Sequence, residues 1–444
     1  MQGTCPTPSI WSSPRELEQT MKKTLLLLVL IAGTFAAVAC DAATTLSTTD
    51  TETTAAETTT TTSETTTISD TTTDTTTTVI TLDPDSLEAN IPAECADVPI
   101  VSGWVPTWCE EFNYEGAVDS TKWRHQIGGG GFGNNELQYY TNRAENAYVD
   151  GEKLIITALR EDYGGHDYTS AKIWTQGVKN WKYGKFEMRA KLPGVAGTWP
   201  AFWMMPRLSV YGDWPASGEI DIMEHTAFYN IDNVVGSLHT TAYNHKIGTQ
   251  ISYGRETPGL TTGFHIYSVT WNEYSFSWWV DSYKYGTYVF NPAAVAYGDF
   301  SIADAWPFDQ EFYLILNLAM GGAMGGTVDP SFVIDTYEID YVRVYQRDYV
   351  TEDTGAPRAA TALEVAQAVG STAYVFWTKA VDDNQVRRYN VYINGVFFKA
   401  VSLNLVKLTG LVVGTSVLIE IEAEDYAGNF APKAAISVTT TEPS

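Results

Sequence analysis

The sequence predicts an all-β protein that contains two β-sandwiches, one large and one small. Short segments rich in Val, Ile, Tyr and Trp recur between residues 104 and 346, separated by Gly, Asn and Asp turns. The clearest are residues 153–158, 184–192, 264–280 and 337–345. A second series follows residue 356, and the chain has 14 Trp, 26 Tyr and 17 Phe but only 18% charged residues. This spacing and composition favour stacked sheets over alternating β and α units.

The N-terminal region has the pattern of an export signal. Met21-Lys22-Lys23 precedes a short apolar run at residues 24–31, which is too short to span a bilayer. We therefore expect residues 1–20 to be an extension upstream of the true start and residues 21–40 to be the signal peptide. The signal ends in Ala-Val-Ala-Cys40, which resembles a bacterial lipoprotein box with an acylated cysteine. Plain Ala-x-Ala cleavage is the alternative. The expected location is extracellular, as a bacterial cell-surface lipoprotein that touches the membrane only through this lipid anchor.

Residues 41–94 have the composition of a disordered tether. Thr dominates, for example at residues 58–62 and 75–78, and eleven acidic residues occur with no Lys or Arg. Such a segment has almost nothing to bury. The formal net charge of the chain is −26, which argues against nucleic acid as a partner.

The chain has four cysteines, Cys5, Cys40, Cys95 and Cys109. Cys5 lies in the upstream extension and Cys40 is the expected lipidation site, which leaves Cys95 and Cys109. Export permits a disulfide between them, and two buried free thiols are the alternative. No Cys/His cluster has zinc spacing.

The most informative stretch is Ser-Gly-Glu-Ile-Asp-Ile-Met-Glu-His at residues 217–225. On a strand, Glu219 and Asp221 point to the same face, and a β-bulge at Ile222 or Met223 would bring Glu224 to that face too. Three neighbouring carboxylates repel one another and cost desolvation, so folding alone would avoid them, and a solvated acidic face is the alternative to a catalytic role. Two carboxylates with separated pKa values are what glycoside hydrolysis requires.

Several blocks together resemble glycoside hydrolase family 16, in its laminarinase-like branch. The resemblance covers roughly residues 104–347 and rests on residues 108–112 with 122–123, 133–141, 199–206, 218–224, 238–240, 264–265 and 337–345. It implies a catalytic domain over residues 95–348, folded as a curved jelly-roll whose concave face forms an open cleft. It also implies a retaining mechanism with Glu219 as nucleophile, Glu224 as general acid/base and Asp221 between them.

The same resemblance implies five substrate-binding residues. Trp199 and Trp203 would stack on the apolar face of a pyranose ring, with core packing as the alternative. Trp214 precedes the acidic strand, and for this residue sugar stacking and core packing are equally good explanations. Asn134 offers a donor and an acceptor for sugar hydroxyls, or else forms a turn. His239 is expected within reach of the carboxylates.

Two features are less well matched to the family. Lys172 stands where the family often has Arg, so it loses bidentate geometry, and the loop at residues 317–326 lacks a "G-N-W" motif. No cofactor is expected for catalysis. The resemblance implies one structural calcium ion held by Glu111, the Gly151 carbonyl and Asp340, with an ordinary salt bridge or turn as the alternative.

Residues 356–441 resemble a fibronectin type III domain, an immunoglobulin-like sandwich. Trp377 matches the core Trp and residues 425–429 match a late "D-x-A-G-N" turn, whereas Val417 replaces the expected corner Tyr. We expect this domain to be a spacer.

Three functions compete at this stage. The first is a monomeric, retaining endo-β-1,3-glucanase whose partner is a β-glucan of the laminarin type. The second is a related hydrolase of mixed-linkage glucan or of red-algal galactan. The Asn134-Asn135-Glu136 block favours laminarin-type glucan over the galactans but does not exclude mixed-linkage glucan. The third is a non-catalytic β-glucan-binding protein, which is disfavoured because Glu219 and Glu224 are both present.

Overall fold

The computed structural model describes residues 86–347, 353–383 and 385–443. The signal, Cys40 and most of the Thr-rich segment lie outside the described residues. Within the described part of the chain, no helix is both long and apolar enough to cross a membrane.

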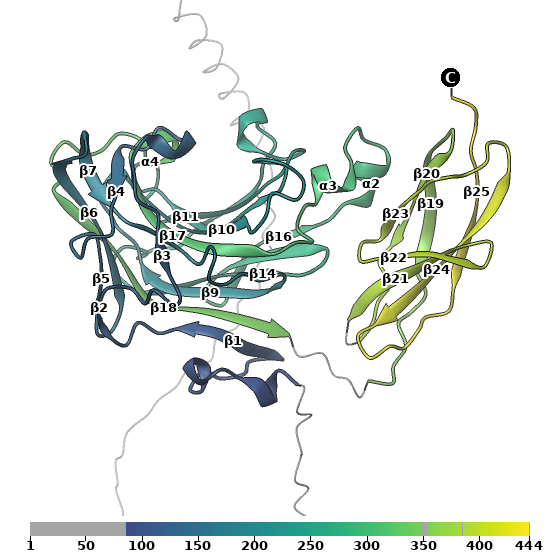
Figure 1. Ribbon diagram of the computed structural model, residues 1–444, viewed down its shortest axis with the longest axis horizontal. Helices are drawn as coiled ribbons and strands as arrows, with labels where there is room; N and C mark the ends of the chain where they lie inside the picture. The colour runs from purple at the N-terminus through teal and green to yellow at the C-terminus, as the bar shows by residue number, and fades with distance from the viewer. Residues whose placement is uncertain (1–85, 348–352, 384, 444) are drawn as a thin grey trace, which may run out of the picture. The chain divides into compact units, whose positions relative to one another are not determined.

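The first β-sandwich consists of an eleven-stranded and a seven-stranded sheet that lie one above the other (Figure 1). The eleven-stranded sheet contains β1 (Trp104–Glu110), β2 (Glu115–Gly116), β4 (Gln138–Tyr140), β5 (Ala147–Asp150), β6 (Leu154–Tyr163), β7 (His166–Ser170), β9 (Gly184–Lys191), β14 (His265–Trp271), β15 (Ser275–Val280), β16 (Tyr283–Val289) and β18 (Ile334–Arg347). The seven-stranded sheet has the order β13-β12-β11-β10-β17-β8-β3 and contains β3 (Arg124–His125), β8 (Lys172–Trp174), β10 (Thr198–Pro206), β11 (Glu219–His225), β12 (Asn233–His239), β13 (Ile251–Glu256) and β17 (Phe312–Met320).

Helical structure in the first sandwich and the segment before it is confined to single turns and short helices. These are η1 (Glu88–Asn90), η2 (Ala93–Cys95), η3 (Gly131–Gly133), η4 (His245–Ile247), α2 (Pro292–Ala296), α3 (Ile302–Ala305) and α4 (Gly322–Gly325). The all-β prediction is confirmed.

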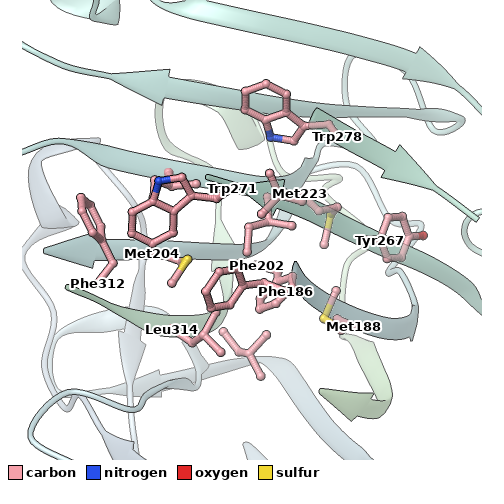
Figure 2. Packing of buried hydrophobic residues seen from close by; sticks show 14 of the residues in the cluster. Phe186, Met188, Phe202, Met204, Met223, Tyr267, Trp271, Trp278, Phe312 and Leu314 are labelled. Atoms are coloured by element: carbon pink, nitrogen blue, oxygen red, sulfur yellow. The ribbon is translucent and has the colours of Figure 1, made fainter. Parts of the chain in front are cut away.

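The core fills the space between the two sheets, because each strand turns its alternate apolar side chains inward. Figure 2 shows Phe202, Met204, Met223, Phe312 and Leu314 of the seven-stranded sheet packed against residues of the facing sheet. The labelled partners in the eleven-stranded sheet are Phe186, Met188, Tyr267, Trp271 and Trp278. The outward side chains of the seven-stranded sheet therefore form a separate face.

One expected strand is in fact a hairpin. Residues 264–280 form β14 and β15, separated by a turn at residues 272–274. The Asn272 side chain closes this turn, since its Oδ1 accepts from the backbone N–H of Tyr274 (3.1 Å) and of Ser275 (2.9 Å). The polar pair Asn272-Glu273 marks this turn, but the apolar and aromatic pattern resumes at Tyr274 and makes the segment look continuous.

The segment before β1 is packed against the first sandwich. Cys95 and Cys109 form a disulfide, and with Val98 and Tyr345 they build a small buried cluster. The two 3-10 turns η1 and η2 fall within residues 86–95, most of which the sequence assigns to the tether. Residues 88–90 of the expected tether thus form a 3-10 turn.

The second sandwich has seven strands in two sheets, ordered β19-β20-β23 and β22-β21-β24-β25. Trp377 and Tyr389 lie in its core, with ring centroids 5.1 Å apart. The strands are β19 (Thr361–Val369), β20 (Thr372–Thr378), β21 (Val386–Ile393), β22 (Val396–Val401), β23 (Leu405–Leu408), β24 (Ser416–Asp425) and β25 (Ala434–Thr439).

Candidate active site

A β-bulge in β11 brings the three carboxylates to one face, as the sequence predicts. Asp221 pairs with Trp203 of β10 and Glu224 with Ala201, so two residues of β11 lie opposite Phe202 alone. The pairing with β12 shifts at the same place. Ile222 and Met223 are consecutive and both buried in the core. Glu219, Asp221 and Glu224 consequently all project from the outward face.

Each terminal carboxylate of this row has its own indole donor. Trp214 donates its Nε1–H to Glu219, and Trp199 donates its Nε1–H to Glu224 Oε1 at 3.1 Å. Both glutamates are partly exposed, whereas Asp221 between them is only 2% exposed. The two predicted substrate-binding tryptophans Trp199 and Trp214 therefore contact the carboxylates directly.

His239 lies on β12 opposite Glu219, and its Nε2 is 3.2 Å from Asp221 Oδ2. Ligand-type atoms of Glu219, Asp221 and His239 all lie within 4.8 Å of one another. The imidazole ring also packs against Trp214, with centroids 6.1 Å apart. The structure thus brings His239 to the carboxylates as the sequence predicts.

Burial raises the pKa values of all three carboxyl groups, and repulsion between them adds to the rise for Glu219 and Glu224. Burial, followed by the charge of Asp221, raises the pKa of Glu219 above its ordinary value, and His239 and the Trp214 N–H oppose this rise. Burial raises the pKa of Asp221 as well. Burial also raises the pKa of Glu224 well above its ordinary value, and the charges of Asp221 and Glu219 add to this rise. Three carboxyl groups this close together favour a state in which at least one of them holds a proton.

Trp203 is held by a polar network on the same face. Its Nε1–H donates to Asn317 Oδ1 at 2.7 Å, and the Lys172 ammonium lies 4.6 Å from its ring centroid. Asn317 in turn donates to the Tyr140 hydroxyl at 3.1 Å. Burial lowers the pKa of Lys172 to about 8, against the opposing charges of Glu136 and Glu219. Lys172 therefore presents a single buried ammonium group, which makes a cation–π contact with Trp203, where an arginine would offer two parallel donors.

Asn134 lies at the C-terminal end of η3. Its carbonyl accepts from Ala323 N at 2.8 Å, which ties this turn to α4 at the Met320 end of β17. Phe228 lies at the same end, since a Cβ on Gly326 would be 2.4 Å from its ring. Asn134 is thus part of a wall beside the outward face and is partly exposed.

The predicted calcium ligands do not fit a metal site as they stand. Glu111 accepts hydrogen bonds from Arg343 Nε (2.8 Å) and Nη2 (2.7 Å), and Asp340 is ion-paired with Arg189. Gly151 lies in a turn with φ +101°. A cation at this place would have to displace two arginines, so calcium binding stays a prediction and no step below depends on it.

The sequence reasoning missed three residues of the outward face, Trp174, Tyr313 and Asn317. Alternate residues of β17 enter the core, namely Phe312, Leu314, Leu316, Leu318 and Met320. Tyr313 and Asn317 consequently share the face of the carboxylates. The sequence does mark Asn317, because β17 otherwise consists of apolar residues and one tyrosine, Tyr313.

A two-sheet β-sandwich with a bulged row of three carboxylates, two indole donors and outward aromatic side chains defines a carbohydrate-processing hydrolase scaffold. The comparisons identify the family. The model of glycosyl hydrolases family 16 matches residues 134–342. The chain is 47% identical over 248 residues to the beta-glucanase of Rhodothermus marinus, across 55% of this chain and 85% of that protein. The chain therefore belongs to glycosyl hydrolases family 16.

Solved structures agree with this assignment. The laminarinase from Rhodothermus marinus matches with a TM-score of 0.52 and 46% identity, covering 55% of this chain and 98% of that one. SCLam, a non-specific endo-beta-1,3(4)-glucanase, matches with a TM-score of 0.51 and 40% identity over 56% of this chain and 94% of that one. The matched part is the jelly-roll sandwich that carries the carboxylates.

Proposed function

We propose that the protein is a retaining, endo-acting glycoside hydrolase that cleaves β-1,3-glucan of the laminarin type. The observation that carries the proposal is the bulged strand, which sets Glu219 and Glu224 on one face, each with its own indole donor. Its relatives named as a beta-glucanase and a laminarinase support the substrate class. One chain supplies the complete carboxylate row, which supports action as a monomer.

The reaction proceeds in two displacements. The ionised Glu219 attacks the anomeric carbon while Glu224 gives its proton to the glycosidic oxygen, so the bond to the leaving glucan breaks. The products of this step are a shortened glucan chain and a glycosyl ester on Glu219. Glu224, now ionised, takes a proton from water, and the resulting hydroxide attacks the anomeric carbon and frees Glu219. Asp221 lies between the two glutamates in the row, with its Oδ2 3.2 Å from His239 Nε2.

Two variants test these roles. Glu219→Ala should abolish turnover of laminarin while the circular dichroism spectrum stays that of the wild type. Glu224→Gln should be severely impaired, but azide should restore turnover of an activated aryl glycoside and give a β-azide product. An α-azide product from Glu224→Gln would reverse the two assignments, and near wild-type activity of either variant would end the proposal.

Mixed-linkage glucan is the second candidate substrate. SCLam, a structural relative, is a non-specific endo-beta-1,3(4)-glucanase. Product analysis on laminarin, lichenan and agarose separates the possibilities, and activity confined to lichenan would replace the first candidate. A non-catalytic glucan-binding role is disfavoured because both glutamates are present and positioned on one face.

We also propose that the second sandwich is a fibronectin type III-like spacer. Its support is the three-plus-four strand division and the Asp425–Asn429 turn, in which Asn429 N donates to Asp425 Oδ1 at 2.8 Å.

We propose further that Cys40 anchors the mature protein to the outer surface of a bacterial cell. The support is the order of basic residues, apolar run, Ala-Val-Ala-Cys and tether in the sequence. Cys40→Ala should move the enzyme from the membrane fraction to the medium or leave an uncleaved precursor. Unchanged fractionation, with no lipid on the mature N-terminus, would support simple secretion instead.

A further inference from the structure

The outward face of the seven-stranded sheet carries a partly exposed tryptophan that the reaction above does not use. Among the tryptophans of the first sandwich, Trp104, Trp174, Trp203, Trp214 and Trp279 are partly exposed and the others are buried. Trp203 and Trp214 belong to the site already described, and Trp104 and Trp279 belong to the other sheet. Trp174 is therefore the one that shares the face of the carboxylates without a role.

The register places Trp174 in line with the reacting groups. Trp174 of β8 pairs with Ile315 of β17, Ile315 pairs with Trp203 of β10, and Trp203 pairs with Asp221 of β11. Three strand spacings separate Trp174 from Asp221, a distance of about 14 Å. A glucan chain that crosses these strands would pass Trp203 first and reach Trp174 only with a more distant sugar ring.

The surroundings of Trp174 leave it available to a ligand. Its indole Nε1–H has no hydrogen-bond partner in the part of the chain that the structure describes, whereas the indoles of Trp199, Trp203 and Trp214 are all bonded. Its one ring contact there is with Tyr313, edge to face, with centroids 6.1 Å apart. Ile173, its neighbour on β8, points into the core.

Tyr313 links this place to the catalytic row. It is 7% exposed and lies on β17 opposite Met205, which is next to Met204, the partner of Ile220. Burial raises the pKa of the Tyr313 phenol to about 12, and the charge of Glu219 adds to this rise. The Tyr313 ring thus supports Trp174 on the side that faces the carboxylates.

We propose that Trp174, supported by Tyr313, forms a distal subsite that stacks on a glucosyl ring several residues from the cleaved bond. The proposal rests on the proposed glucanase function and gives it a preference for long chains. A ring with apolar axial C–H groups matches the indole face, and the free Nε1–H can donate to a sugar hydroxyl. A ligand too short to cross from β11 to β8 would not reach Trp174.

The test compares Trp174→Ala with Trp104→Ala, a matched change of a partly exposed tryptophan on the other sheet. For laminarin oligosaccharides of increasing length, Trp174→Ala should raise KM by roughly three- to tenfold for the long members with kcat nearly unchanged. An aryl laminaribioside should show no change. Trp174→Phe should recover most of the affinity for long chains, because the apolar ring is kept.

A binding measurement separates this inference from the proposed function. In a Glu219→Gln background, calorimetric titration with a long laminarin oligosaccharide should show the same fold-loss of affinity on adding Trp174→Ala. Equal losses on short and long substrates, or no loss on long ones, would overturn the subsite while leaving the glucanase function intact. Failure of the wild type to hydrolyse laminarin would instead overturn the proposed function.

Discussion

The two indole donors should control opposite limbs of the pH profile. Trp214→Phe removes the N–H that bonds Glu219, and Trp199→Phe removes the N–H that bonds Glu224. Each bond favours the ionised carboxylate and lowers its pKa. A hydrogen bond to a charged group contributes about 1.5–3 kcal/mol, and one pKa unit corresponds to about 1.4 kcal/mol, so each loss should raise a pKa by about one to two units.

The sign differs between the variants because the two glutamates need opposite protonation states. Glu219 must be ionised, so activity rises with pH through its pKa, and Trp214→Phe should move the acidic limb to higher pH. Glu224 must be protonated, so activity falls through its pKa, and Trp199→Phe should move the alkaline limb to higher pH. The assay is kcat/KM on laminarin from pH 4 to 10, which reports the free enzyme.

Limb positions are read independently of the height of the profile, so a general loss of activity from the smaller ring does not obscure the result. Movement of the alkaline limb by Trp214→Phe, or of the acidic limb by Trp199→Phe, would mean that the roles of Glu219 and Glu224 are exchanged. Two unmoved limbs would refute the idea that these hydrogen bonds tune the site.

Three further predictions follow from the same structure. Lys172→Met removes a positive charge that favours ionised Glu219, so the acidic limb should move to higher pH, whereas Lys172→Arg should keep it in place. Replacing both Cys95 and Cys109 by Ser opens a loop with a sequence separation of 14, and denaturant unfolding should show a loss of about 3 kcal/mol with kcat unchanged; unchanged stability would contradict this. Because Arg343 and Arg189 already pair with Glu111 and Asp340, chelation with EDTA should leave Tm and activity unchanged, and a Tm raised by added calcium would show that these ion pairs open to admit the ion.

The sequence predicts the fold class and the catalytic row because both depend on local periodicity. Alternation along each strand marks the core face, and the spacing of Glu219, Asp221 and Glu224 already requires a bulge if the three are to act together. The hairpin at Asn272 is not predicted, because the polar pair Asn272-Glu273 is short and the apolar pattern resumes at once after it.

The residues that lie beside the three carboxylates could not be predicted, because their positions depend on the pairing of strands that are distant in the sequence. Nothing in the sequence near Lys172 or Trp174 indicates that β8 lies beside β17, and β17 beside β10. The strand order puts Lys172 opposite Asn317 and Trp174 in line with Asp221. The ion pairs of Glu111 and Asp340 could not be predicted for the same reason, because Arg343 and Arg189 are distant from them in the sequence.

The bulge itself can be tested with two matched deletions of a buried isoleucine from β11. Deleting Ile222 removes the extra residue, so the pairs Ala201–Glu224 and Trp203–Asp221 can both remain and all three carboxylates stay on the outward face. Deleting Ile220 instead changes the phase between Glu219 and Asp221, and one of them must turn toward the core. Loss of the buried Ile222 side chain should cost about 2–5 kcal/mol, seen as a lower Tm, with measurable laminarin hydrolysis retained.

The Ile220 deletion should give no activity and little soluble protein, since an unpaired carboxylate would face apolar side chains. A folded but wholly inactive Ile222 deletion, with Glu224 no longer able to protonate a leaving group, would show that the bulge fixes the distance between the glutamates and not only their face. Equal activity of the two deletions would refute the register argument, because alternation along the strand would then not decide which carboxylates meet the substrate.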